Sequence, residues 1–420
     1  MTPPQITTPA PPLTRNRNYQ ILWGSQALSM FGTNATYIAY PLLVLVLTGS
    51  PALSGLVLGV SAAAELVAGI PAGALADRWS RKRIMLACEA GQVLTTAVFV
   101  LALWWHLANA PMLLAVAVIL GACESVFRPA ETACLPSIVP GEQVASAVAG
   151  NAARGYLGNL AGTAAGGFLF ALGRALPFVA NLLAHGLSLL ALIFLRLPQR
   201  EPAPAVPIRH LGREMLDGLH FMWRHRNIRV TSLCAVLLNL FFSAFYIVIV
   251  VLAKSRGMPA GEIGVMAAML GVGGILGALA APRLTRILSP YQCIVGVFWT
   301  LTLLTPLAVL VHNGYLMGVL FAAMALLPPA ANTAIISEQL LSTPDELRGR
   351  LSGVLGVLAG AAAAIGPTLG GALTSAVSGV SAVLCCSAGI ALLTLLATIS
   401  PTLRHFPRHT TTPEGKTPDE

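Results

Sequence analysis

The chain has 420 residues, of which 56% are hydrophobic and 10% are charged, and its formal net charge is +9. Soluble domains carry about 25% charged residues and alternate apolar with polar faces, whereas the apolar runs here are almost unbroken, which excludes a soluble fold. The positive charge does not indicate a nucleic-acid partner, because Arg and Lys fall between the apolar runs rather than along one exposed face. The sequence therefore predicts an integral membrane protein.

The ends of the chain and the cysteines carry no recognisable site. Residues 1–14 are rich in Pro and lack the basic start of a signal peptide. The segments 1–16 and 401–420 are both expected to be disordered cytoplasmic tails. The seven Cys residues lie within apolar segments or at their ends, with no spacing typical of disulfides or of a metal site. We expect no metal and no cofactor.

Twelve apolar runs are each long enough to cross a membrane as a helix, since about 20 residues at ~1.5 Å per residue span the roughly 30 Å hydrocarbon core. The predicted spans lie near residues 19–47, 52–75, 84–105, 111–134, 143–172, 175–197, 227–253, 260–281, 290–311, 314–338, 347–376 and 378–399. A linker at 198–226, with several prolines and an amphipathic segment, separates two six-span domains at 17–197 and 227–400.

Basic residues indicate how the chain is oriented. Most Lys and Arg residues fall in loops on the side of the two termini, whereas Arg174, Lys254 and Arg256 lie on the opposite side. The positive-inside rule then predicts cytoplasmic termini in a multi-pass protein of the cell membrane, inner or plasma. The basic part of the linker is expected to lie on the anionic inner leaflet. Binding of a partner protein there is the alternative.

A repeat relates the two halves. Gly73-Ala-Leu-Ala recurs as Gly277-Ala-Leu-Ala, and Gly162-Thr-Ala-Ala-Gly-Gly aligns with Gly366-Pro-Thr-Leu-Gly-Gly at the same offset. A six-span unit that is repeated in parallel places a substrate path between the halves, near the membrane midplane. It also permits alternating access by movement of one half against the other.

The loop after the second predicted span carries a recognisable motif. The pattern G-x-L-a-D-R-x-G-R-K is matched by Gly73, Leu75, Asp77, Arg78, Arg81 and Lys82, with Ser80 in place of the second Gly. With twelve spans and a long central loop, this motif resembles the major facilitator superfamily over residues 17–400. The segments TGSPALSGLV and RPAETACLPSIVP further resemble the branch that includes the enterobactin exporter and macrolide-efflux permeases. The resemblance implies an all-α membrane protein whose twelve transmembrane helices form two pseudo-symmetric six-helix bundles.

The same resemblance implies a gating latch that joins the two halves in the outward-facing state. Its expected members are Gly73, Asp77, Arg78, Arg81, Lys82 and Glu131. The alternative is a basic loop that only fixes the orientation of the chain. The repeat has Ala281 in place of the acid, so only one latch is expected.

Glycines in the fifth and eleventh predicted spans are expected to allow close helix packing. In drug-proton antiporters of the superfamily the fifth helix commonly carries G-x-x-x-G-P-x-x-G-G, and here Thr163 replaces the Pro, which appears in the second half as Pro367. The matching and repeated glycines are Gly158, Gly162, Gly166, Gly167, Gly366, Gly370 and Gly371.

Ionisable residues inside spans are costly and are functional candidates by default. Glu65, Glu124, Arg128 and Arg154 are the candidates for proton coupling or substrate binding. Glu124 and Arg128 are four residues apart and can pair, which leaves Glu65 as the favoured proton carrier. Structural ion pairs between helices are the alternative for all four. Glu89 is expected to face the basic loop.

Polar residues at helical spacing predict the walls of the path. On the first and seventh spans they are Gln26, Thr33, Asn34, Tyr37, Asn239, Ser243 and Tyr246. A third stripe, on the sixth span, comprises Asn181, His185 and Ser188. These three are expected to form hydrogen bonds between helices.

The sequence therefore predicts a secondary transporter that exports an amphipathic small molecule, such as a drug, a siderophore or another secondary metabolite, by alternating access with proton antiport. Its expected partners are this cargo, protons and membrane lipids, and a monomer is expected. The proton gradient is the expected energy source. An uptake permease is the alternative within transport, and a lipid flippase or a non-transporting membrane sensor is the alternative outside it. No nucleophile–base pair or phosphate-binding loop indicates an enzyme.

Overall fold

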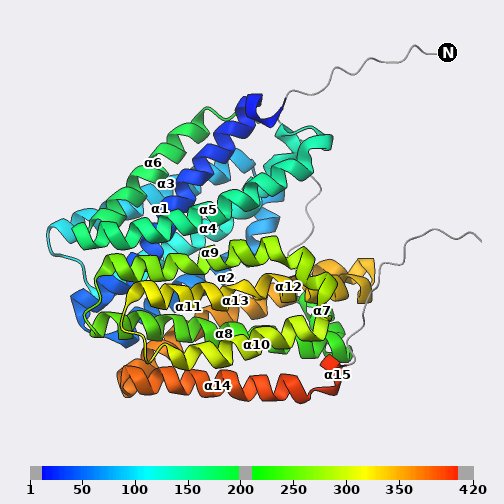
Figure 1. Ribbon diagram of the computed structural model, residues 1–420. Helices are drawn as coiled ribbons and strands as arrows, with labels where there is room; N and C mark the ends of the chain where they lie inside the picture. The colour runs from blue at the N-terminus through cyan, green and yellow to red at the C-terminus, as the bar shows by residue number, and fades with distance from the viewer. Residues whose placement is uncertain (1–11, 198–210, 405–420) are drawn as a thin grey trace, which may run out of the picture.

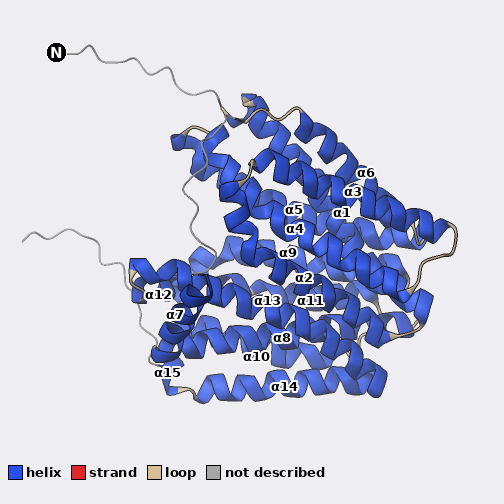
Figure 2. Ribbon diagram, turned by 180° about the vertical axis from the view of Figure 1, so that it is seen from behind, coloured by secondary structure: helices blue, strands red, loops and turns tan. Residues whose placement is uncertain are grey.

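The computed structural model describes residues 12–197 and 211–404, and its regular structure there is entirely helical (Figure 1; Figure 2). The first half contains α1 (Arg17–Thr48), α2 (Pro51–Arg78), α3 (Arg81–Trp104), α4 (Ala110–Ile138), α5 (Val144–Leu172) and α6 (Leu176–Ile193). The second contains α8 (Arg226–Ser255), α9 (Ala260–Ile287), α10 (Pro290–Leu307), α11 (Gly314–Leu326), α12 (Pro328–Ser342), α13 (Asp345–Ala376) and α14 (Gly379–Ile399). Short elements are the 3-10 turns η1 (Leu13–Arg15) and η2 (Gly141–Gln143), and the helices α7 (Leu211–Arg224) and α15 (Pro401–Arg404).

Local signals set the tight turn between α1 and α2. Gly49 ends α1 with a φ of 65°, in the left-handed region that favours glycine. The Ser50 side chain accepts a hydrogen bond from the Leu53 N–H, and Pro51 occupies the first turn of α2, as is common at helix starts. We call the end of the molecule that carries this turn the distal face. The end that carries residues 12 and 404 is the termini face.

Twelve helical segments have the length of a membrane span. Eleven of them are also apolar enough to cross a membrane, with α11 and α12 counted as one segment from Gly314 to Gln339. The twelfth is α5, which is 29 residues long and packs against both α1 and α9. Its high content of small residues suits contact with other helices rather than with lipid. Among the described residues, the number of helical segments of span length therefore equals the predicted twelve, and eleven of them are also apolar enough to cross a membrane.

The helices form two bundles. Helices α1 to α6 lie together in one half, and α8 to α14 lie together in the other (Figure 1). Helix α7 belongs to the predicted linker and packs on α13, where Asp217 forms an ion pair with Arg350 at 3.0 Å. The apolar side chains of Leu216 and Trp223 on α7 remain exposed. The predicted fold class, two six-helix bundles, is confirmed.

Parts of the predicted tails are helical. Residues 12–16 include η1, and Asn16 Nδ2 donates to the carbonyl of Ile138 at 2.6 Å, so this segment is held on the end of α4. Residues 401–404 form α15. The remaining residues of both predicted tails, and residues 198–210 of the linker, lie outside the described part of the chain.

The tenth predicted span, at 314–338, is broken rather than continuous. Helix α11 ends at Leu326 and α12 begins at Pro328. Pro328 and Pro329 have no N–H, so the carbonyls of Met324 and Ala325 lose the helical donors four residues ahead of them. The break therefore leaves backbone acceptors inside the second bundle.

The two bundles touch backbone to backbone near the distal face. A Cβ atom on Gly55 of α2 would lie 2.1 Å from the Pro367 carbonyl oxygen of α13, and one on Gly371 would lie 2.9 Å from the Gly55 Cα. The equivalent pair on the other side of the interface is Gly167 of α5 and Gly264 of α9, with a Cβ on Gly167 only 2.5 Å from the Gly264 Cα. Helix pairs α2–α13 and α5–α9 therefore hold the halves together here.

Helices α2 and α13 separate toward the termini face. Gly360 of α13 still meets the Leu66 side chain, at 2.9 Å from a built Cβ atom. A Cβ atom on Gly356, Gly353 or Gly349, each nearer the termini face, would meet nothing within 4 Å outside its own helix. The bundles accordingly diverge toward the end where the chain termini lie (Figure 1). The interface is closed at the distal face and open at the termini face.

Replacement of Gly371 with Ala tests the distal contact. The added Cβ would lie 2.5 Å from the Pro51 carbonyl oxygen, and overpacking of this kind costs about 1–3 kcal/mol. The matched control is Gly24→Ala on α1, where a Cβ meets nothing within 4 Å and the change should stabilise the helix by about 0.5–1 kcal/mol. Thermal unfolding of the purified protein in detergent should show a lower midpoint for Gly371→Ala only. Equal midpoints for the two variants would contradict the close approach.

Candidate functional site

A cavity of about 520 Å³ lies between α2 and α13 and extends toward the termini face. Glu65, Gly69 and Ser125 line it from the first half, and Arg350 and Gly353 line it from the second. A smaller cavity of about 80 Å³ continues between α1, α2 and α4. Glu65 lines both cavities, so this carboxylate stands where the central space enters the first bundle.

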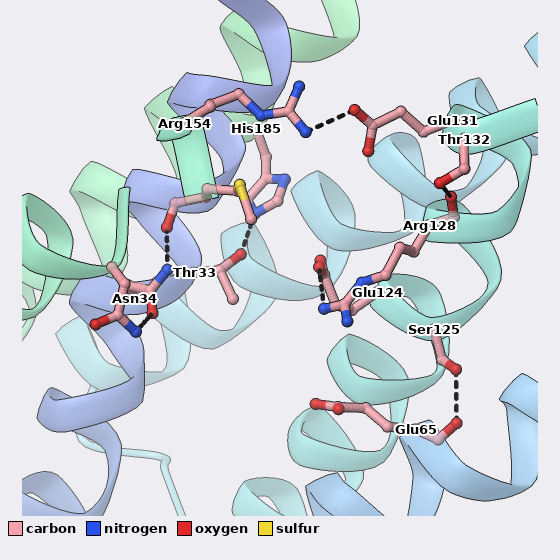
Figure 3. Close-up of polar contacts among 12 residues, drawn as sticks. Thr33, Asn34, Glu65, Glu124, Ser125, Arg128, Glu131, Thr132, Arg154 and His185 are labelled. Atoms are coloured by element: carbon pink, nitrogen blue, oxygen red, sulfur yellow. Dashed lines mark hydrogen bonds and ion pairs between the residues drawn. The ribbon is translucent and has the colours of Figure 1, made fainter. Parts of the chain in front are cut away.

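Glu65 is exposed to this space rather than paired. Its backbone carbonyl accepts a hydrogen bond from Ser125 Oγ at 2.6 Å, which fixes α2 against α4. Within the described residues no hydrogen bond or ion pair is recorded for its carboxylate, and Figure 3 shows that side chain clear of the Arg128 guanidinium. Glu65 therefore presents its carboxylate to the cavity.

The other three predicted ionisable residues do not form one network with Glu65. Glu124 and Arg128 pair along α4 at 3.6 Å, and the Arg128 side chain is 69% exposed. Arg154 of α5 instead binds Glu131 of α4 at 2.6 Å, and both side chains are buried, at 5% and 9% exposure. The two ion pairs are separate (Figure 3). In this conformation Arg154 holds α5 against α4 within the first bundle.

The expected latch residues make contacts within their own half. Arg81 donates to the carbonyl of Ala133, and Lys82 Nζ donates to the carbonyls of Ile193 and Leu195 at 2.7 Å. Lys82 therefore stabilises the C-terminal end of α6, whereas Arg81 binds near the C-terminal end of α4. Nothing lies within 4 Å of a Cβ atom on Gly73. The Asp77 side chain lies outside the described residues.

The predicted cavity residues occupy different environments. Tyr37 is exposed, and its ring centroid lies 6.2 Å from that of Tyr246 in the other half. Asn34 accepts a hydrogen bond from Asn159 Nδ2 at 3.0 Å. Gln26 was predicted to line the path, but it is 5% exposed and buried in the first bundle. It lies on the face of α1 that carries Ser29, which packs toward α3 instead of the cavity.

The second bundle encloses an apolar cavity of about 420 Å³ between α8, α9, α10 and the broken helix α11–α12. Its polar side chains are the amides of Asn239 and Asn332, and none of its lining residues is charged. A neighbouring cavity of about 500 Å³ shares Ala235, Asn239 and Asn332 and continues toward the termini face. Asn239 also accepts a hydrogen bond from Ser243 Oγ at 3.2 Å. The two asparagines therefore stand where an apolar chamber meets an open passage.

The architecture agrees with comparisons against known proteins. A family model described as transmembrane secretion effector, within the major facilitator superfamily (MFS), matches residues 7–419. The chain belongs to this family. As an MFS protein it is a multi-pass membrane transporter, and its relatives are not enzymes.

Two curated efflux proteins resemble this MFS transporter over most of its length. The multidrug efflux pump Tap of Mycolicibacterium fortuitum is 27% identical over 392 residues, which cover 89% of this chain and 93% of Tap. The enterobactin exporter EntS of Shigella boydii is 26% identical over 400 residues, which cover 92% of this chain and 93% of EntS.

Solved structures of transporters share the fold. A bacterial homologue of the human lysosomal transporter Spinster, in an inward-facing and unoccupied conformation, superimposes with a TM-score of 0.74 at 16% identity and covers 93% of this chain and 98% of its own. The nucleoside transporter NupG gives a TM-score of 0.70 at 14% identity and covers 93% of this chain and 100% of its own. At these identities the likeness concerns the fold alone.

The MFS transporter also contains a polar cluster that the sequence analysis did not find. Glu89 was predicted to face the basic loop, and that prediction was wrong: Glu89 is 1% exposed and faces α1 and α6. His185 Nδ1 lies 2.7 Å from its Oε2. The expected hydrogen bonds of Asn181, His185 and Ser188 to other helices are confirmed. The missed signal was the spacing of Glu89, Gln92 and Thr96, which places all three on one face of α3.

The Glu131–Arg154 pair can be tested by removing one or both charges. Arg154→Met leaves Glu131 buried without its partner, which should destabilise the protein by about 3–5 kcal/mol. The double variant Glu131→Leu with Arg154→Met buries no charge and should recover most of that loss. Thermal unfolding in detergent is the measurement. A double variant as unstable as the single one would mean that the pair matters through more than charge.

Proposed function

We propose that this MFS transporter exports an amphipathic small molecule across the cell membrane by alternating access, driven by proton entry. The observation that carries the proposal is a central space with two unlike walls. The first half contributes the unpaired Glu65 and the exposed Glu124–Arg128 pair. The second half contributes an uncharged apolar chamber. The ionisable wall of the first half suits proton binding, and the apolar wall of the second half suits binding of the cargo.

The distribution of basic residues supports the direction of opening. Lys and Arg are concentrated in the loops of the termini face, whereas Arg174, Lys254 and Arg256 are the basic residues of the distal loops. The positive-inside rule therefore places the termini face in the cytoplasm. The open end of the interface then faces the cytoplasm, where an exporter collects its cargo.

The chamber in the second half suits an apolar molecule with a few hydrogen-bonding groups. Its volume of about 420 Å³ lies within the range of about 300–1,000 Å³ that is typical of small-molecule sites. Asn239 and Asn332 offer amide donors and acceptors at its edge. The broken helix adds carbonyl acceptors, as discontinuous helices do in other transporters. A sugar or a dicarboxylate would require more polar or charged partners than these.

Glu65 supplies a route for coupling. As a carboxylate it is stable in the water-filled cavity, but it becomes costly when the cavity closes and water leaves. A proton taken up from the distal side would neutralise it for the return to the cytoplasm-facing state, where the proton is released to cytoplasmic water. One proton then enters for each return of the empty carrier.

Closure at the termini face would bring α2 and α13 together where they now diverge. Gly349, Gly353 and Gly356 of α13 present no side chain to an approaching helix, and Gly73 of α2 has nothing beside it. The latch that we propose for the outward-facing state, with Asp77, Arg81 and Glu131, lies at this same end. Its formation requires that Glu131 exchange Arg154 for Arg81, because Arg154 now holds that carboxylate.

Substitution of Glu65 with Gln tests the proton carrier. The amide keeps the size of the side chain but cannot exchange a proton, so movement of ethidium in energised membrane vesicles should fall to the rate seen without a pH gradient. The matched control is Glu142→Gln, because Glu142 is an exposed acid of η2 on the termini face. Gradient-driven transport that survives Glu65→Gln would remove this residue from the mechanism. Inward accumulation of dye by the wild type would indicate uptake, and translocation of lipid headgroups would indicate a flippase.

A bulky residue in the apolar chamber tests the cargo wall. Ala235 lines both cavities of the second half, so Ala235→Trp should abolish ethidium efflux while leaving the protein folded. Leu237→Trp is the control, because Leu237 is exposed on the same helix and lines neither cavity. Dye efflux from reconstituted vesicles is the measurement. Equal rates for the two variants would place the cargo path elsewhere.

A further inference from the structure

Glu89 and His185 form an enclosed acid–imidazole pair inside the first bundle. Glu89 comes from α3 and His185 from α6, and their side chains are each 1% exposed. Glu89 Oε2 lies 2.7 Å from His185 Nδ1. Its other oxygen, Oε1, accepts hydrogen bonds from Ser29 Oγ at 2.8 Å and from Ser188 Oγ at 2.9 Å. Both carboxylate oxygens are therefore held in place.

Among residues 12–197 and 211–404, the groups that the structure places around this pair do not include a fixed positive charge. Helix α1 contributes the hydroxyl groups of Ser29 and Thr33, and α6 contributes His185 and Ser188. The nearby titratable groups on α3 and α4 are the thiols of Cys88 and Cys123, followed by the carboxylate of Glu124. All of these are neutral or negative in their usual states. Only a proton can balance the charge of the Glu89 carboxylate.

Thr33 connects the pair to the central space. Its Oγ1 lies 3.3 Å from His185 Nε2 (Figure 3), and it lines the small cavity that Glu65 and Glu124 also line. Close packing at Gly32 sets this distance, because a Cβ there would lie 2.8 Å from Asn181 Oδ1 on α6. The imidazole therefore reaches cavity water through a single hydroxyl group.

Burial favours the protonated form of this pair. With a neutral imidazole that donates through Nδ1, the pair carries one net negative charge in a medium that solvates charge poorly. One added proton makes the pair neutral overall, as an imidazolium beside a carboxylate. Histidine is the side chain that gains and loses a proton most readily near neutral pH.

We propose that Glu89 and His185 form a second, internal proton-binding site of the first half, reached from the central cavity through Thr33. In the uptake step, a hydronium ion in the cavity gives a proton to Thr33 Oγ1 and is left as water, while that hydroxyl gives its own proton to His185 Nε2. The new N–H bond is made at His185, and the hydroxyl is restored. Release reverses these steps. The site stores a proton beside Glu65, and this role rests on the proton antiport proposed above.

The site can be tested without transport. Nitrogen-15 spectra of histidine-labelled protein in detergent distinguish imidazole from imidazolium, and the His185 signal is identified by its loss in His185→Asn. Between about pH 5 and 8, the wild-type signal should change from one form to the other. In Glu89→Gln it should stay neutral throughout, because the balancing charge is gone. His312, exposed in the α10–α11 loop, should respond identically in both proteins.

The spectra also define what would overturn the proposal. A His185 signal that keeps one form over the whole range in the wild type would show that the pair is only a structural hydrogen bond. A His185 response that is unchanged in Glu89→Gln would show that the carboxylate does not hold the proton. Both outcomes stand whether or not the protein moves any dye, so they are separate from a failure of the proposed function.

The route through Thr33 has its own matched pair of variants. Thr33→Val keeps the shape of the side chain but removes the hydroxyl, and should lower gradient-driven ethidium transport by about tenfold, the cost of one hydrogen bond, while leaving downhill exchange intact. Thr36→Val is the control, because the Thr36 hydroxyl bonds only to backbone carbonyls of α1. Equal rates of gradient-driven ethidium transport in Thr33→Val and Thr36→Val would contradict the proposed proton route through Thr33. So would a loss in Thr33→Val that is as large for downhill exchange as for gradient-driven transport.

Discussion

The structure depends on the backbone contact between the halves at the distal face. Gly55 against Gly371, and Gly167 against Gly264, bring helices of the two bundles closer than any side chain would allow. Gly167 and Gly371 are equivalent in the repeat, and their partners lie on the equivalent helices α9 and α2, so the two contacts hold the bundles together on either side of the central space. A bundle that is held at one end can separate only at the other. The open termini face follows from that constraint.

The low dielectric of the membrane explains why the halves differ in charge. An ionised group there must be paired, solvated or neutralised by a proton, and three acids of the first half have different surroundings. Glu131 is paired with Arg154, Glu65 lines the open cavity, and Glu89 is enclosed beside His185. The chamber of the second half needs no such arrangement because no charged residue lines it. In the proposed mechanism, proton transfer and cargo binding therefore use different walls of the central space.

Sequence predicted the features that depend on composition and period, and missed those that depend on which helix faces which. Hydrophobic length and the repeat were enough for twelve spans and two bundles. When all sides of a helix are apolar, the sequence does not show which side faces the cavity and which faces other helices. The predicted surroundings of Glu89 and Gln26 were wrong for this reason. Arg154 and Glu131 were both noticed, but their pairing depends on the approach of α5 to α4. The break in the tenth span does have a sequence signal, because Pro328 and Pro329 both lack an N–H.

The repeated Gly-Ala-Leu-Ala motif shows how the two halves acquired different roles. A Cβ on Gly277 would lie 2.1 Å from the Leu326 carbonyl oxygen, and one on Gly273 would lie 2.1 Å from that of Ala322. Helix α9 thus packs on the backbone of α11 just before the break and keeps the apolar chamber in shape. A Cβ atom on its counterpart Gly73 would meet nothing within 4 Å, and Gly73 lies at the diverging end of α2. The repeated glycine therefore lies at a close helix contact beside the chamber in one half and at the diverging end of α2 in the other.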